Sequence, residues 1–259
     1  MSRLIKKGVI LFLILIWAWE SSAIASSLPD VISKVKPSIV GVGTYLKTRG
    51  PPAKLMGTGF VILDGMHIIT NAHVVQNEIK RKRGESLTIF TNVKERVVMQ
   101  AATILEIDED HDLALLKISG SSLPALTLGN SDNAREGQQV AFTGFPIGAV
   151  LGLHPVTHRG IISAITPVVV PVYASFKLNP QLIKRMQSPY NVFQLDATAY
   201  PGNSGSPVYD TSNGKVLAVI NKVFIKETKE SVLDKPSGIT YAIPAIHIRK
   251  LLEKRNQEK

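Results

Sequence analysis

Short apolar runs separated by turn residues recur along this chain from Ser38 to Ile243, and this pattern constrains the fold more than any other feature. Several of the runs alternate apolar with small or polar residues, as strands do, and turn pairs such as Asp64-Gly65 lie between them. Strands are expected at residues 38–47, 57–63, 66–70, 87–90, 96–107, 113–118, 139–143, 160–165, 192–195, 207–209, 216–220 and 239–243. So many short strands predict an all-β protein, either a sandwich or a barrel.

Three segments fit helices instead. Apolar residues within 26–37 lie at helical spacing, with Pro29 near the start. Asn179 is a good N-cap followed by proline, which predicts a short helix over residues 181–186. A third helix is expected from Pro244 onward, because Ile248 and Leu251 share one face there and can dock on the core.

The first 25 residues have the organisation of a secretory signal peptide. Arg3, Lys6 and Lys7 are followed by an apolar run over residues 8–19 and by the cleavage pattern Ala23-Ile24-Ala25. The run is shorter than the ~20 residues that a spanning helix prefers. Removal of residues 1–25 is therefore expected, with a periplasmic or secreted product. The alternative is an uncleaved membrane anchor.

Composition excludes some classes of site and suggests some partners. The chain contains no cysteine, so it has no thiol nucleophile and no cysteine metal site. Its formal net charge is +10, and the densest basic run is Lys80-Arg81-Lys82-Arg83. That run is either a solvated loop or a weak contact for anionic surfaces. Because no aromatic residues are interleaved with it, no nucleic-acid partner is expected.

A serine in the stretch Pro201 to Val208, PGNSGSPV, is the candidate nucleophile. Ser204 lies among glycines, which adopt backbone angles that other residues avoid and let a substrate approach the main chain. Backbone N–H groups of Gly202 and Ser204 could stabilise a developing oxyanion. A plain structural turn is the alternative, because turns are rich in these residue types.

Histidine and aspartate candidates precede this serine in the chain. His73 follows a predicted strand and could take the serine proton as a neutral imidazole. Asp112 directly precedes the apolar strand 113–118 and could hold the histidine tautomer. Asp108, Glu109 and Asp110 are the competing acids, but they lie in a run that looks solvated. The base and the acid fall in the first half and the serine in the second, which suits a cleft between two β-barrels.

On these residues the chain resembles trypsin-like serine proteases, in particular the HtrA/Deg family. The matching motifs are Gly57-Thr58-Gly59-Phe60, Thr70-Asn71-Ala72-His73-Val74-Val75, Asp112-Leu113-Ala114-Leu115-Leu116-Lys117-Ile118 and Gly202-Asn203-Ser204-Gly205, within about residues 28–255. The resemblance implies two six-stranded antiparallel β-barrels with a C-terminal helix, the first barrel within residues 26–124 and the second within 125–259.

The same resemblance implies a function. It predicts a cofactor-free and metal-free exported serine endopeptidase that acts on unfolded or damaged proteins and peptides. His73 would be the base, Asp112 the orienting acid and Ser204 the nucleophile, and the loop Gly202-Asn203-Ser204 would form the oxyanion hole. Relatives in this family commonly form trimers, so a homo-oligomer is compatible with the resemblance.

Some residues depart from the family pattern. The chain ends soon after the second barrel, so no PDZ domain is expected. Ser206 replaces the usual glycine and makes the loop similar to that of glutamyl endopeptidases, but Asn221 stands where those enzymes have a pocket histidine. A glutamate-specific protease and a catalytically silent peptide-binding relative are therefore the alternatives. Residues 167–190 form a longer loop than usual, either a decoration of the second barrel or a lid or docking surface.

The family pattern also locates a specificity pocket, formed by Thr198, Ile220, Asn221 and Lys222. Thr198 occupies the pocket floor, where a trypsin-type enzyme has a carboxylate. Without that carboxylate, Lys and Arg side chains have no ionic partner in the pocket, and Lys222 would repel them further. Cleavage after uncharged, apolar residues is therefore expected.

Overall fold

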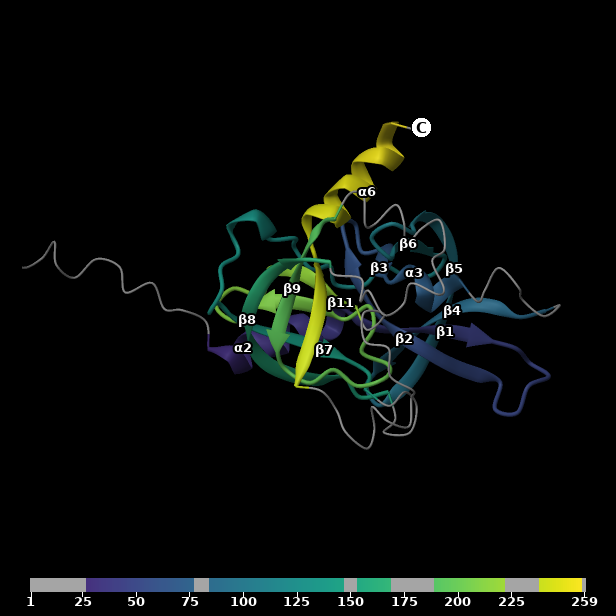
Figure 1. Cartoon of the computed structure of the whole chain (residues 1–259). Helices are drawn as coiled ribbons and strands as arrows, with labels where there is room; N and C mark the ends of the chain where they lie inside the picture. The colour runs from purple at the N-terminus through teal and green to yellow at the C-terminus, as the bar shows by residue number, and fades with distance from the viewer. Residues whose placement is uncertain (1–26, 77–83, 147–152, 169–188, 222–237, 258–259) are drawn as a thin grey trace, which may run out of the picture.

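The computed structural model describes residues 27–76, 84–146, 153–168, 189–221 and 238–257. Within them, twelve strands form two closed antiparallel barrels that lie beside one another (Figure 1). The strand order is β1-β2-β3-β6-β5-β4 in the first barrel and β10-β11-β12-β9-β8-β7 in the second. This architecture confirms the predicted all-β fold with two six-stranded barrels.

Both barrels are built from consecutive strands. The first contains β1 (Ile39–Tyr45), β2 (Ala53–Ile62), β3 (His67–Thr70), β4 (Ser86–Val93), β5 (Arg96–Asp108) and β6 (Leu113–Ile118). The second contains β7 (Gln139–Gly144), β8 (Val156–Pro167), β9 (Asn191–Asp196), β10 (Pro207–Asp210), β11 (Val216–Asn221) and β12 (Ile239–Pro244). β1 pairs with β4 and β7 with β10, so each barrel closes and has no free sheet edge.

Two strands begin four residues earlier than the sequence pattern predicts. β2 begins at Ala53 instead of Gly57, and β8 begins at Val156 instead of Gly160. The first residues of β8 pair with the end of β7, and the Thr157 hydroxyl lies 2.9 Å from that of Thr143. Because a ladder satisfies the backbone polar groups of any residue, pairing with a neighbour extends these strands beyond the segments that the local pattern marks.

Helices lie at the two ends of the described chain and beside the strands. They are α2 (Leu28–Val35), α3 (Ala72–Val75) and α6 (Ile246–Gln257), with the short 3-10 turns η1 (Lys36–Ser38) and η3 (Ser131–Asn133). α2 and α6 confirm the first and last predicted helices. The predicted helix over 181–186 lies outside the described residues.

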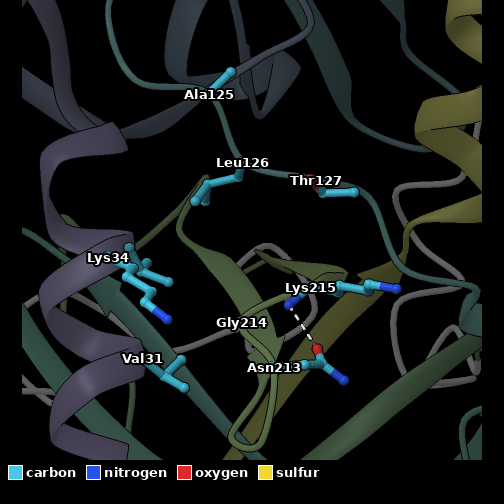
Figure 2. Close-up of a pocket in the computed structure, with 9 residues that line it drawn as sticks. Val31, Lys34, Ala125, Leu126, Thr127, Asn213, Gly214 and Lys215 are labelled. Carbon is cyan, nitrogen blue, oxygen red and sulfur yellow. Dashed lines mark hydrogen bonds between the residues drawn. The ribbon is translucent and has the colours of Figure 1, made fainter. Parts of the chain in front are cut away.

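Each terminal helix contacts the barrel that is farther from it in sequence. A Cβ placed on Gly214 of the second barrel would lie 3.3 Å from Val31 of α2. Figure 2 shows the residues of α2, of the linker around Leu126 and of the turn at Gly214 that line a common hollow. Its volume is about 210 Å³. At the other end, α6 rises from the top of the molecule in Figure 1, and Lys254 forms an ion pair of 2.7 Å with Glu106 of β5.

Three clusters of buried apolar side chains hold the fold together. One fills each barrel, and the third joins the barrels to each other and to both terminal helices through residues such as Phe60, Tyr209 and Ile248. Burial of one such side chain contributes roughly 1.5–3 kcal/mol. The shared cluster therefore fixes the two barrels against each other, which any site between them requires.

Candidate active site

His73 and Asp112 lie together because their strands are neighbours in the first barrel. β3 ends just before α3, which carries His73, and β6 begins just after Asp112, with Thr70 paired opposite Ala114. The His73 Nδ1 atom lies 2.6 Å from Asp112 Oδ2, and the His73 backbone N–H donates to Oδ1 at 2.8 Å. The carboxylate therefore holds both the ring and the main chain of the histidine.

The turn that carries Asp112 has an unusual backbone conformation. Asp112 has φ of +52°, in the left-handed region that costs a non-glycine residue on the order of 1 kcal/mol. Its carbonyl oxygen accepts hydrogen bonds from the Ala72 N–H at 3.1 Å and from the Asn71 Nδ2 at 3.0 Å. These two bonds connect the Asp112 carbonyl to the start of α3 and offset the strain. Only 6 % of Asp112 is exposed.

A further donor to Asp112 comes from the second barrel. Asn221, the last residue of β11, donates from Nδ2 to Asp112 Oδ2 at 2.9 Å and is itself buried. The family pattern assigns Asn221 to the specificity pocket, but its side chain contacts the carboxylate. Nothing in the sequence indicates this contact, because the two residues lie 109 positions apart. The sequence shows only that an amide residue directly follows the apolar run Val216–Ile220, which does not identify its partner.

Ser204 lies in a turn whose shape depends on glycine. Gly202 and Gly205 have φ values of +100° and +87°. A Cβ on Gly205 would lie 2.0 Å from the carbonyl oxygen of Thr58, so no other residue fits there. Within the described part of the chain, no acceptor takes the Gly202 or Ser204 N–H, whereas the Asn203 N–H donates to the Tyr200 carbonyl at 3.0 Å.

Thr58 of β2 holds the serine turn from the opposite barrel. Its N–H donates to the Ser204 carbonyl at 2.9 Å, and its hydroxyl donates to the Gly202 carbonyl at 2.7 Å. The same hydroxyl accepts from the Phe145 N–H at 3.0 Å. One threonine therefore joins the serine turn to the start of the β7–β8 connection and to the first barrel. The sequence indicates no such role for it.

Gly57, next to Thr58, shows how closely the serine turn approaches α3. A Cβ on Gly57 would lie 3.0 Å from the Ser204 carbonyl oxygen and 2.8 Å from a methyl group of Val74, the residue after His73. The turn and the helix therefore meet across a single glycine. The helix that carries His73 and the turn that carries Ser204, which are far apart in sequence, lie close together.

The competing acid Asp108 pairs with a different histidine. Its Oδ2 atom lies 2.7 Å from the Nδ1 of His111. Burial raises the pKa of Asp108, but hydrogen bonds and charge from His111 outweigh this and bring the pKa below its ordinary value. Asp64 pairs in the same way with His67 at 2.7 Å, and that hydrogen bond lowers the pKa of Asp64. Neither pair lies beside a serine turn.

The other predicted site residues are only partly described. Thr198 is half-buried and Ile220 is buried in β11. Lys222 and the basic run Lys80–Arg83 lie outside the described residues, as does most of the loop 167–190. Among the residues that the structure describes, no group of acidic or histidine side chains could hold a metal ion. None of the described helices has the length and apolar character to cross a membrane.

Comparison with known proteins places this geometry in context. The family model described as "Trypsin-like peptidase domain" matches residues 57–219. "Serine protease HTRA1" of Xenopus tropicalis is 29% identical over 240 residues, which cover 89% of this chain and 44% of that protein. "Probable periplasmic serine endoprotease DegP-like" of Halomonas elongata is 32% identical over 189 residues, covering 73% and 32%.

A solved structure supports the fold. "HtrA-type protease AlgW with decapeptide" aligns with a TM-score of 0.64 at 23% identity, over 90% of this chain and 68% of that chain. The chain spans less than half the length of the two relatives above. The matched family segment contains His73, Asp112 and Ser204.

Proposed function

Because the chain belongs to the trypsin-like peptidase domain family and resembles its HtrA-type members, we propose that it is a serine endopeptidase using Ser204, His73 and Asp112. The two-point contact of Asp112 with His73, beside the glycine turn that carries Ser204, is the observation that carries this proposal. It is the arrangement in which a buried acid orients an imidazole toward a hydroxyl.

In the proposed reaction, the Ser204 hydroxyl oxygen attacks the carbonyl carbon of the scissile peptide bond while His73 accepts its proton. The tetrahedral intermediate collapses, the C–N bond breaks and His73 gives the proton to the leaving amine. Water then attacks the acyl-enzyme, loses a proton to His73, and Ser204 is regenerated as the carboxyl product leaves. The His73 side chain is 32 % exposed, so its ring can reach substrate on one side while Asp112 holds the other.

Asp112 would stabilise the imidazolium that forms in each step. Its carboxylate accepts from the His73 N–H, from the His73 ring and from Asn221, so neither oxygen is left unpaired. Hydrogen bonds to a charged group contribute about 1.5–3 kcal/mol each. Asn221 acts in this proposal as support for the acid.

The Gly202 and Ser204 N–H groups would stabilise the oxyanion. Both lack an acceptor among the described residues and lie on either side of Asn203, whose own N–H is occupied by Tyr200. The hydrogen bond from the Thr58 hydroxyl to the Gly202 carbonyl fixes the orientation of the peptide group between Gly202 and Asn203. Two preorganised donors of this kind are typical of oxyanion holes, where one donor contributes 10²–10³-fold in rate, or about 2.7–4 kcal/mol.

We propose unfolded or damaged proteins and peptides as substrates, cleaved after uncharged apolar residues. Thr198 supplies no carboxylate for a basic side chain, and burial of one aliphatic side chain gives a preference of roughly 1.5–3 kcal/mol. The Asn221 side chain donates a hydrogen bond to Asp112, and this disfavours a glutamate-binding pocket that depends on Asn221. A peptide library should therefore be cleaved mainly after Val, Ile, Ala or Leu.

Export through removal of residues 1–25 is also part of the proposal, and a relative named as periplasmic supports it. Residues 1–25 lie outside the described residues. Self-association and contact of Lys80–Arg83 with anionic surfaces remain predictions. Size measurement in solution and mass determination of the protein recovered from the cell envelope would test self-association and cleavage.

Two serines in the same turn allow a sharp test of the nucleophile. Ser204→Ala should fold normally and lose peptidase activity by a factor on the order of 10⁴ or more. Ser206→Ala removes the neighbouring hydroxyl, which is buried and has no role in the proposed chemistry. Hydrolysis of a denatured protein and of a fluorogenic peptide should persist in Ser206→Ala. Retained hydrolysis in Ser204→Ala contradicts the proposal.

A further inference from the structure

Three aromatic rings from three separate elements meet beside the catalytic acid. His111 lies in the β5–β6 turn of the first barrel, Tyr190 precedes β9 of the second barrel, and His247 lies in the first turn of α6. The rings of His111 and His247 are stacked, with centroids 3.9 Å apart and planes at 27°. Tyr190 lies 4.6 Å from the His111 ring and 5.0 Å from the His247 ring, which it meets edge-on.

His111 has a direct connection to the reaction because it immediately precedes Asp112. Its backbone N–H donates to Asp108 Oδ1 at 3.0 Å, and its ring Nδ1 lies 2.7 Å from Oδ2 of the same carboxylate. The next residue, Asp112, has the strained left-handed conformation. A shift of the His111 ring would therefore turn the peptide that sets the direction of the Asp112 carboxylate.

We infer that His247 and Tyr190 are positioning residues for the catalytic acid, which act through His111 on the turn that carries Asp112. This inference rests on the proposed function, because it assigns a role to residues behind the proposed triad. By this route the C-terminal helix and the second barrel set the orientation of a carboxylate that the first barrel supplies.

The contact between His247 and the turn relies on ring packing. His247 is buried, and within the described residues its Nδ1 has no hydrogen-bond partner. Burial, the charge of His111 and the charge of Lys250 lower the pKa of His247 to about 3, against an opposing effect of Asp108. A neutral ring can stack on His111 without charge repulsion. A hollow lies beside His111, and the charged side chains that line it are Asp108, Glu109, Asp110, Lys250 and Lys254.

Two substitutions of His247 separate the effect of its ring packing from the effect of its titration. His247→Phe keeps a flat ring against His111, whereas His247→Ala removes it. We expect His247→Ala to lower kcat by about 10-fold or more with KM changed less than about 3-fold, and His247→Phe to stay within about 3-fold of the wild type. The acidic limb of the pH profile of kcat/KM should move to lower pH in His247→Ala, because a displaced Asp112 stabilises the imidazolium of His73 less well.

Leu252→Ala is the matched control. Leu252 lies on the same helix and packs against the shared apolar cluster, without a ring contact to His111. Compared at equal fractions of folded protein, Leu252→Ala should leave kcat and the acidic limb of the pH profile of kcat/KM unchanged. If His247→Ala and Leu252→Ala have the same effect, or if His247→Phe is as impaired as His247→Ala, the inference is overturned.

A measurement that does not depend on enzyme turnover tests the positioning role of His247 separately from the proposed peptidase function. The low-field proton resonance of the hydrogen bond between His73 and Asp112 should be lost or broadened in His247→Ala and kept in His247→Phe and Leu252→Ala. An unchanged resonance in His247→Ala overturns the positioning role whatever the activity. Equal peptidase activity of the wild type and Ser204→Ala would instead refute the proposed function, and the resonance would still decide whether His247 orients the pair.

Discussion

The two barrels hold their parts of the site in different ways. In the first barrel, His73 and Asp112 follow and precede the paired strands β3 and β6, and Ala72, Asn71 and His73 all donate to Asp112. In the second barrel, the turn of Ser204 is shaped by two glycines of positive φ, and Thr58 of the first barrel holds it through two hydrogen bonds.

This difference separates local from long-range organisation. The proposed base and acid are hydrogen-bonded to each other within one barrel. The proposed nucleophile and oxyanion donors depend on contacts between the barrels, and so do two outer supports of the acid, the bond from Asn221 to Asp112 and the packing of His247 on His111. Substitutions in the two groups should therefore have different signatures: direct loss of chemistry in the first, and loss of alignment between barrels in the second.

The largest effect is expected from Asp112→Asn. An amide cannot accept from both the His73 N–H and the ring in the correct tautomer, so kcat/KM should fall by about 10⁴-fold with little change in KM. Asp64→Asn is the matched control, because Asp64 also pairs with a histidine at 2.7 Å but lies at the far end of β3. A fluorogenic peptide assay compares them. Equal activity of the two variants would mean that Asp112 is not the acid.

Thr58→Val should have the next largest effect. It removes the hydroxyl that donates to the Gly202 carbonyl and accepts from Phe145, and each buried group left unpaired costs about 1–3 kcal/mol. The rate of labelling by a fluorophosphonate should fall about 10–100-fold, because the serine turn is misaligned. Thr88→Val, a buried threonine whose hydroxyl bonds within its own strand, should label like the wild type. Normal labelling of Thr58→Val would show that the turn needs no support from the first barrel.

Asn221→Ala should have an effect on catalysis of similar size. It removes one of several donors to Asp112, and a hydrogen bond to a charged group contributes about 1.5–3 kcal/mol, which corresponds to a decrease in kcat of about 10–100-fold. KM for an apolar peptide should stay within about 3-fold, because the side chain contacts the acid and not the substrate. The kcat and KM values of the same peptide series check this. A rise in KM with unchanged kcat would return Asn221 to the pocket.

Acid should weaken the folded state through protonation of His247. The pKa of His247 falls from 6.5 to about 3, chiefly by burial, so the folded protein binds fewer protons than the unfolded chain between these values. The free energy of unfolding should therefore drop as the pH falls from 6.5 toward 3, by about 2–4 kcal/mol from this residue. Burial also lowers the pKa of His158 and acts in the same direction.

His247→Phe tests that pH dependence. Denaturant unfolding at several pH values should give a shallower loss of stability below pH 6.5 for this variant than for the wild type. Parallel curves for the two proteins would mean that His247 does not titrate on unfolding in this range.

Much of the fold could be predicted from the sequence because its strands have a strong local pattern. Each of the twelve described strands overlaps an expected segment, from β1 to β12. The beginnings of β2 and β8 were missed because residues 53–56 and 156–159 join their ladders by pairing with a neighbouring strand, which the local pattern does not show. α3 was missed because four residues are too few for a helical period, and tertiary contacts stabilise such a turn.

The candidate site was predictable to the extent that each residue lies in a local motif. Ser204 lies among glycines, His73 follows a strand and Asp112 precedes one, so each has a signal in its own neighbourhood. The roles of Thr58, Asn221 and His247 have no such signal. Their partners lie far away in sequence, and only the packing of the barrels and of α6 brings them together.

Identification of the residue that a fluorophosphonate modifies shows whether Ser204 is the nucleophile. Peptide mass spectrometry of the labelled wild type should show a single adduct on Ser204, formed far more slowly in Asp112→Asn, because the first barrel must activate a serine of the second. An adduct on Ser206 or on another residue, or no adduct at all on the folded protein, would contradict the account.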